Sequence, residues 1–176
     1  FVARAAPDGH TILFGSVATH AIASGLYSKL TYDALKDFVP VMQVTSSPLL
    51  VTSSMKLNAS TLAELIATAK AQPGKLNYGS TGNGTAVHLA AEVLKASTGM
   101  DVLHVPYKGG PDAIQALITG DTAFMVTNLE LALPQVRGGK VRALAVTGSR
   151  RIAALPDVPT LREAGVAGTE VTTWFG

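Results

Sequence analysis

The sequence predicts an α/β fold in which a parallel-type sheet is covered by helices. From residue 76 onward, short apolar strand patterns alternate with amphipathic helix patterns, and the connecting loops are only a few residues long. This alternation is typical of βαβ units, whose strands run parallel. Hydrophobic residues make up 47% of the 176 residues and charged residues 15%, so the chain has enough apolar surface to build a core. That core is expected to form one domain or two small lobes.

Extended segments are expected in the first third of the chain. The segment "HTILFGS" (10–16) is an apolar run that ends in Gly-Ser, and it predicts a strand that leads into a loop. The segment "FVPVMQVTSSPLLVTSS" (38–54) is rich in β-branched residues and broken by prolines, which favours extended structure over a helix. A helix is predicted over residues 60–74, because Thr61 and Glu64 have the spacing of a capping box and a Pro-Gly pair ends the pattern.

The later elements follow in regular order. Strands are predicted at residues 76–79, 102–106, 122–127 and 141–147. Helices are predicted at 85–97 and 111–119, each followed by a glycine suited to a C-cap, and the second has Pro111 in its first turn. A short helix interrupted at Pro134 is expected after the third strand. An extended piece and a helix of one or two turns are expected after the fourth.

The composition argues against several classes of function. The net charge is only +2 and the basic residues are scattered, so no nucleic-acid partner is expected. The absence of cysteine removes thiol catalysis, thiolate metal sites and disulfides. No apolar stretch is long enough to predict direct membrane insertion. Because no close ligand spacing links the histidines, no metal site is expected either. These histidines are His10, His20, His88 and His104.

The strongest candidate site is the segment "GSTGNGT" at residues 79–85, called here the glycine loop. Glycines permit positive φ angles and allow backbone N–H groups to converge. Ser80, Thr81 and Thr85 add hydroxyl groups, and the helix that follows contributes partial positive charge at its N-terminus. These features predict an anion site that needs no charged side chain. The alternative is an ordinary strand–helix turn in which Thr85 acts only as an N-cap.

Other loops are expected at the same edge of the sheet, because ligands of open α/β sheets bind at the carboxyl ends of strands. These loops are Gly15-Ser16, "YKGG" at 107–110 and Thr127-Asn128. Lys108 is either a solvated surface lysine or a source of positive potential for a bound anion, and the sequence leaves both open.

Enzymatic functions of the glycine loop are less well supported. A nucleotide site would need G-x-G-x-x-G or a Walker G-K-[ST], and the loop has G-x-x-G-x-G instead. A hydrolase would use Ser80 as its nucleophile, but the G-x-S-x-G spacing is missing and no carboxylate is singled out to orient His88. His104 is expected to be a core or interface residue. A hydrolase-like or nucleotide-binding enzyme remains the alternative, followed by a domain that binds protein partners, while no catalytic residue is expected.

Several motifs occur here in a consistent order and spacing. They are "PDGHTILFGS" (7–16), "LYSKLTYDALKDFVPVMQV" (26–44), "PGKLNYGSTGNGTAVHLAAE" (73–92), "VPYKGGPDAI" (105–114), "GKVRALAVTGSRRIAALPDVPTLREAG" (139–165) and "TWFG" (173–176). With these motifs the sequence resembles the extracytoplasmic solute receptors of tripartite tricarboxylate transporters, the Bug receptors. The resemblance extends over essentially the whole chain.

The resemblance implies a periplasmic-binding-protein fold of type II, in which two α/β lobes joined by crossing strands close over a ligand. Residues 1–50 would then be part of the first lobe, residues 51–170 the complete second lobe, and residues 171–176 a strand returning to the first lobe. Members of the family have a further N-terminal strand with a Pro-Gly-Gly loop and a helical C-terminal portion. The chain is therefore expected to be a fragment that lacks both.

The resemblance also implies a ligand site and a function. The implied site residues are Ser16, Ser80, Thr81, Gly82, Asn83, Gly84, Thr85, Tyr107, Lys108, Gly109 and Asn128. The glycine loop would cradle a carboxylate, the second loop would line its side, Ser16 would represent the first lobe, and Asn128 would lie at the edge of the cleft. A periplasmic receptor of this kind captures a small carboxylate or amino-acid-like anion by hinge closure. It delivers the ligand to the membrane subunits of the transporter and needs no cofactor. Backbone donors recognise a carboxylate group but not the rest of the molecule, so the identity of the ligand is left open.

Overall fold

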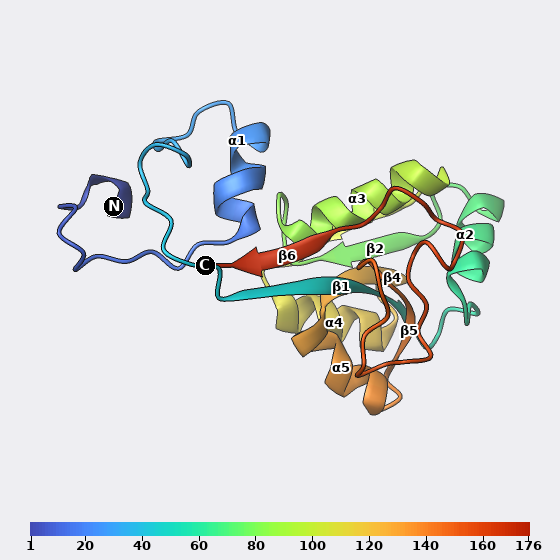
Figure 1. The fold of residues 1–176 in the computed structure, drawn as a ribbon. Helices are drawn as coiled ribbons and strands as arrows, with labels where there is room; N and C mark the ends of the chain where they lie inside the picture. The colour runs from blue at the N-terminus through green and yellow to red at the C-terminus, as the bar shows by residue number, and fades with distance from the viewer. The chain divides into compact units, whose positions relative to one another are not determined.

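The computed structural model describes all of residues 1–176, and the chain divides into two compact units. Unit 1 comprises Phe1–Ser46 together with Thr173–Gly176, and unit 2 comprises Ser47–Thr172. The chain passes from unit 1 into unit 2 along β1 (Thr45–Ser54) and returns along β6 (Thr172–Phe175) (Figure 1). These two strands pair with each other.

Unit 1 has little regular structure. It contains a 3₁₀ turn at Val2–Arg4, a π-helical turn at Ala18–Ile22 and the short helix α1 (Ala23–Leu26). The strand predicted at residues 10–16 is wrong, because this segment makes only one isolated bridge, between Ser16 and Phe175. A strand pattern forms a strand only where a partner takes its backbone hydrogen bonds. The segment otherwise has no such partner, and Ile12 within it is 78% exposed.

Unit 2 is built on a mixed sheet with the strand order β3-β2-β4-β1-β5. The remaining strands are β2 (Asn77–Ser80), β3 (Leu103–Pro106), β4 (Phe124–Asn128) and β5 (Val141–Val146). β2 runs parallel to β3 and β4, whereas β1 runs antiparallel to β4 and β5. The α/β class is confirmed. The prediction of a parallel-type sheet is wrong for β1, because this strand enters the sheet from unit 1 and does not follow a βαβ crossover.

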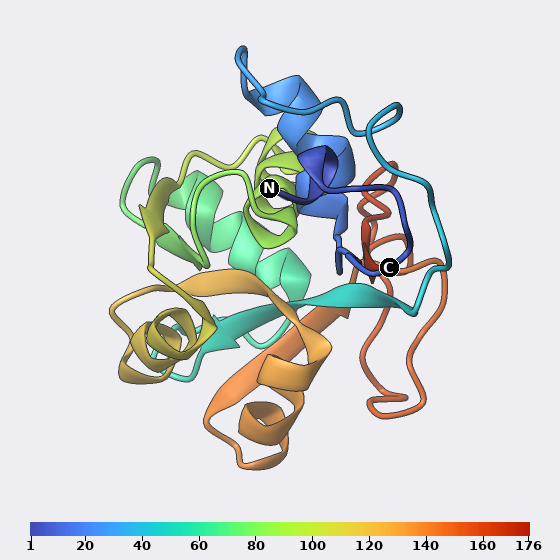
Figure 2. The ribbon, with the colours of Figure 1, turned by 90° about the vertical axis from the view of Figure 1, so that its left-hand side faces the viewer.

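Helices cover both faces of this sheet. α2 (Leu62–Ala71) and α3 (Ala86–Thr98) lie on one face, and α4 (Gly110–Thr119) and α5 (Leu129–Arg137) lie on the other (Figures 1 and 2). Side chains alternate along β1 accordingly: Leu49 and Val51 join the core under α2 and α3, whereas Leu50 joins the cluster under α5. β1, β4 and β5 thus bury side chains on both faces of the sheet, whereas the edge strand β3 has no fully buried residue.

Local signals in the sequence predict the ends of the main helices correctly. Thr61 and Glu64 form the expected capping box of α2. Thr85 caps α3 by accepting a hydrogen bond from the N–H of His88, and Gly99 ends that helix in the left-handed region with φ 69°. Gly120 ends α4 in the same way with φ 80°. These glycine C-caps supply a conformation that other residues adopt only at a cost.

One helix prediction is wrong. α5 continues through Pro134 instead of stopping there. Pro134 lies in the sixth position of this nine-residue helix, so only one intrahelical N–H bond is lost, and Leu129 and Val136 still pack against the core. In the segment after β5, where a helix of one or two turns is expected, the chain makes a single turn, with Ala164 N–H donating to Thr160 O at 3.0 Å. Gly165 ends that turn with φ 86°.

None of the helices combines the length and apolar character needed to cross a membrane.

Candidate functional site

Two of the candidate loops lie side by side at one edge of the sheet. Because β2, β3 and β4 are parallel, their carboxyl ends meet there. The glycine loop follows β2, and the segment Tyr107–Gly109 follows β3. Tyr107 N–H donates to Ser80 O at 3.0 Å, and Tyr107 O lies 3.6 Å from the position that a Cβ on Gly82 would take. The structure therefore brings the two loops together as the sequence predicts.

The glycine loop is held in shape by hydrogen bonds within it and from α3. Gly82 and Gly84 have φ angles of 122° and 76°, so both positions favour glycine. Gly82 N–H donates to Ser80 Oγ at 3.1 Å, and Gly84 N–H donates to His88 Nδ1 at 3.2 Å. Thr85 Oγ1 donates to Gly82 O at 2.8 Å. Side chains thus hold both bends of the loop, which leaves the outer part free to meet a ligand.

Several donors of the loop are left unused by the chain. Amide N–H groups that donate to no acceptor belong to Thr81, Asn83, Thr85, Ala86 and Val87. The side chains of Thr81 and Asn83 also make no hydrogen bond, and Asn83 is exposed. The 13-residue helix α3 adds partial positive charge at the same place. The arrangement can therefore bind an anion through neutral donors.

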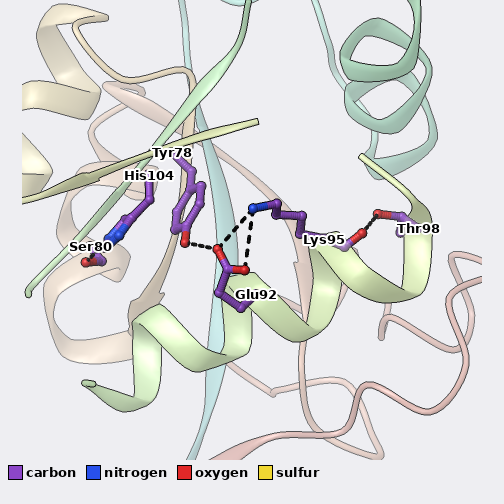
Figure 3. A network of polar contacts seen from close by, with 6 residues as sticks. All are labelled: Tyr78, Ser80, Glu92, Lys95, Thr98 and His104. Atoms are coloured by element: carbon purple, nitrogen blue, oxygen red, sulfur yellow. Dashed lines mark hydrogen bonds and ion pairs between the residues drawn. The ribbon is translucent and has the colours of Figure 1, made fainter. Parts of the chain in front are cut away.

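Ser80 has a different environment from the rest of the loop. It is fully buried, and its hydroxyl lies 2.7 Å from Nε2 of His104 (Figure 3). The histidine considered from sequence as its partner, His88, instead binds Gly84 N–H. A nucleophile must reach its substrate, and the Ser80 side chain is inaccessible. No carboxylate contacts His104 either, since Glu92 accepts a hydrogen bond from the Tyr78 hydroxyl and pairs with Lys95. A serine hydrolase site is therefore not favoured.

Aromatic side chains pack in a row under the loop. The His104 ring stacks between Tyr78 at a centroid distance of 4.8 Å and His88 at 4.3 Å. Burial, together with the neighbouring His88, lowers the pKa of His104, although Glu92 acts in the opposite direction. Burial and the hydrogen bond to Glu92 raise the pKa of Tyr78, which therefore stays a neutral donor. His104 is thus partly buried, as expected, but it also supports the loop.

The residues of the second loop differ in exposure. Lys108 is exposed and makes no hydrogen bond or ion pair. Tyr107 is half-buried, and its ring lies over Gly79, 3.6 Å from the position that a Cβ on that glycine would take. Gly109 is the N-cap of α4 in an extended conformation that any residue can adopt.

The remaining candidates lie at two further positions. Asn128 ends β4 and is the N-cap residue of α5, but its side chain does not cap that helix and remains unengaged. Ser16 belongs to unit 1, where its N–H donates to Thr19 Oγ1 at 3.0 Å. The sequence did not indicate that His88 and His104 hold the loop, because that role depends on the pairing of β2 with β3.

Comparison with known proteins assigns the chain to a class and then to a family. Its mixed α/β fold is shared with several solved structures, among them the periplasmic binding protein BugD at a TM-score of 0.90 and 32% identity, where the match covers 99% of this chain and 58% of that one. A second is Rpa4515 of R. palustris with adipate, at a TM-score of 0.93 and 35% identity, where the match covers 99% of this chain and 58% of that one. Another is MatC of Rhodopseudomonas palustris with bound malate, at a TM-score of 0.90 and 36% identity, covering 99% and 60%. Residues 1–176 match the family model "Tripartite tricarboxylate transporter family receptor". The chain therefore belongs to the tripartite tricarboxylate transporter receptor family.

A curated relative from Pseudomonas sp. strain P51 is encoded in the tcbD–tcbE intergenic region. It is 36% identical over 176 residues, and the match covers 99% of this chain and 52% of the relative. The chain thus spans about half the length of the curated relatives it matches. The identification of the family from the sequence motifs is confirmed.

Proposed function

We propose that this chain holds the carboxylate site of an extracytoplasmic receptor, which captures a small carboxylate and delivers it to the membrane subunits of a tripartite tricarboxylate-type transporter. The observation that carries the proposal is the set of unused amide donors around the glycine loop and the first turn of α3. A carboxylate presents two oxygens that accept several such bonds at once. The relatives solved with adipate and with malate hold ligands of this chemical class.

Neutral donors suit a ligand that must be both captured and released. A carboxylate bound by backbone N–H groups receives charge-assisted hydrogen bonds, without the cost of burying an unpaired lysine or arginine. In the proposed site, Thr81 and Asn83 donate from side chain and backbone, while Ser80 acts mainly through the shape it gives the loop. Lys108 is exposed and adds positive potential at longer range.

The rest of the proposed site comes from other segments. Gly82, Gly84 and Thr85 complete the cradle of the glycine loop, Tyr107 and Gly109 line its side, Asn128 contributes at the end of β4, and Ser16 contributes from unit 1. In this proposal unit 1 is part of the first lobe and unit 2 is the second lobe. The crossing strands β1 and β6 form the hinge. Ligand contacts made by both lobes would favour a closed state, which then docks on the transporter in the periplasm. The proposal assigns no cofactor and no catalytic residue.

Thermal unfolding of the full-length protein with a panel of anions tests the proposal. The panel contains adipate, malate, citrate, acetate, an amino acid and nicotinate, with a nucleotide as the control from another ligand class. At about 100 times its dissociation constant, a true ligand stabilises the folded protein by roughly 2.7 kcal/mol. At least one carboxylate is expected to do so, and isothermal titration calorimetry then gives its affinity. Stabilisation by the nucleotide alone would exclude the receptor.

A further inference from the structure

The two sharp bends of the glycine loop are each tied to a histidine. The first bend, at Gly82, is tied through Ser80, whose hydroxyl accepts Gly82 N–H at 3.1 Å and lies 2.7 Å from His104 Nε2. The second bend, at Gly84, is tied directly, because its N–H donates to His88 Nδ1 at 3.2 Å. Both glycines have positive φ. Without these bonds the two amides would have no acceptor within the chain.

We propose that the stacked pair His88–His104 positions the glycine loop for its ligand, with each imidazole holding one of the two glycine bends. The inference rests on the proposed carboxylate site and adds two residues to it that do not touch the ligand. The benefit is preorganisation: a loop already held in its binding shape loses less conformational entropy when the ligand arrives.

The pair itself is fixed by its surroundings. His104 lies on β3 opposite Tyr78 of β2, and the ring of Tyr78 stacks on its other side at 4.8 Å. The Tyr78 hydroxyl donates to Glu92 of α3, which also pairs with Lys95 at 3.4 Å (Figure 3). The orientation of the His104 ring is therefore set by its own strand β3, by the neighbouring strand β2 and by α3. The His88 ring stacks on it at 4.3 Å.

The bond at Gly84 needs an uncharged imidazole at His88, because Nδ1 accepts the Gly84 N–H. A histidine that carries both protons has no acceptor nitrogen, so a protonated His88 would turn a second N–H toward Gly84 N–H. Two protonated rings stacked at 4.3 Å would also repel each other. The ionisable groups that face the pair are Tyr78 from β2 and Glu92 and Lys95 from α3. Glu92 is engaged with Tyr78 and Lys95 and makes no hydrogen bond to either imidazole.

Burial lowers the pKa of His104, so the ring stays neutral below the usual histidine range. Ligand affinity is expected to fall when the pair becomes protonated, because a protonated His88 loses the nitrogen that accepts Gly84 N–H.

Substitutions in the full-length protein separate the bonds from the stack. His88→Phe and His104→Phe keep an aromatic ring but remove the hydrogen-bonding nitrogens. His88→Asn and His104→Gln place an amide near the lost nitrogen, Nδ1 in the first case and Nε2 in the second. Each Phe variant is expected to lower the affinity for the strongest carboxylate of the panel about tenfold, the effect of one hydrogen bond. The matched amide should restore most of that loss, and His88→Asn should also make ligand affinity less sensitive to acidification.

Amide hydrogen exchange measured by NMR gives a readout that needs no ligand. Exchange at Gly82 should accelerate in His104→Phe, and exchange at Gly84 should accelerate in His88→Phe. The control His10→Gln removes a histidine of unit 1 and should change neither exchange nor affinity. If a Phe variant does not fold, Ser80→Ala tests the first link through exchange at Gly82.

The outcomes distinguish this inference from the proposed function. If the wild-type protein binds a carboxylate and both Phe variants bind it equally well with unchanged exchange, the histidine pair does not position the loop, although the receptor stands. If no carboxylate binds, the proposed function fails, and the exchange rates still show whether the pair holds the loop.

Discussion

Ser80 and Asn83 lie three positions apart in the glycine loop, and their side chains have opposite environments. The Ser80 hydroxyl is buried and hydrogen-bonded to His104, whereas the Asn83 side chain is exposed and makes no hydrogen bond in the chain. A substitution at Ser80 therefore changes the shape of the loop. A substitution at Asn83 changes only what the loop offers to a ligand.

Asn83→Ala is accordingly expected to weaken carboxylate binding without changing stability. A hydrogen bond to a charged group contributes about 1.5 kcal/mol or more, so the affinity should fall roughly tenfold. The matched control is Asn58→Ala, because Asn58 is also exposed and follows the far end of β1. Calorimetric titration and urea unfolding measure the two quantities. Equal affinity in Asn83→Ala and the wild type would remove this side chain from the site.

The anion site proposed at the glycine loop could be inferred from residues 79–85 alone, because glycine spacing and a helix N-terminus are local features. The support that His104 gives to the loop could not be predicted in this way. It depends on the register in which Tyr78 lies opposite His104, 26 residues apart in the chain, and on α3 crossing above them. A single sequence shows the histidines but not which strand they meet.

At the scale of elements, α2 and α3 both begin at a threonine N-cap. Thr61 accepts from Glu64 N–H and Thr85 accepts from His88 N–H. The two helices start at opposite edges of the sheet, because α2 follows the antiparallel strand β1 and α3 follows the parallel strand β2. Only the second cap lies at the proposed ligand edge.

Thr61→Val and Thr85→Val therefore form a matched pair. Each is expected to lower the free energy of unfolding by about 1 kcal/mol, the usual effect of losing an N-cap. Only Thr85→Val should also weaken ligand binding, since Thr85 Oγ1 donates to Gly82 O within the glycine loop. Urea unfolding gives the stability of each variant and titration gives the affinity. An equal loss of affinity in Thr61→Val would mean that the effect follows stability and not the loop.

Elements with local signals were predicted well, and those that depend on distant partners were not. The capping box of α2 and the glycine that ends α3 are fixed by a few neighbouring residues. The direction of β1 is set by its partners β4 and β5, which follow much later in the chain. Residues 10–16 have the composition of a strand, but apart from the bridge at Ser16 no neighbouring strand pairs with them.

At the scale of the whole molecule, the proposed hinge closure predicts a change in size. A saturating carboxylate is expected to lower the radius of gyration of the full-length protein, because both lobes would contact the ligand. Small-angle X-ray scattering measures this directly, with a carboxylate of the panel that does not bind as the control. Binding without any decrease in the radius of gyration would contradict closure while leaving the site in place.

The position of β1 between β4 and β5 has a consequence for the order of folding. Thr52 of β1 meets Met125 of β4, which is synthesised 73 residues later. At ribosomal rates of 5–20 residues per second, this delay is roughly 4–15 s. During that time the segment β2–α3–β3 can assemble from contiguous chain. The apolar residues Leu49–Val51 of β1 meanwhile have neither of their neighbouring strands, β4 and β5. β1 is therefore the segment of unit 2 most exposed to pairing with another nascent chain before its own partners have been made.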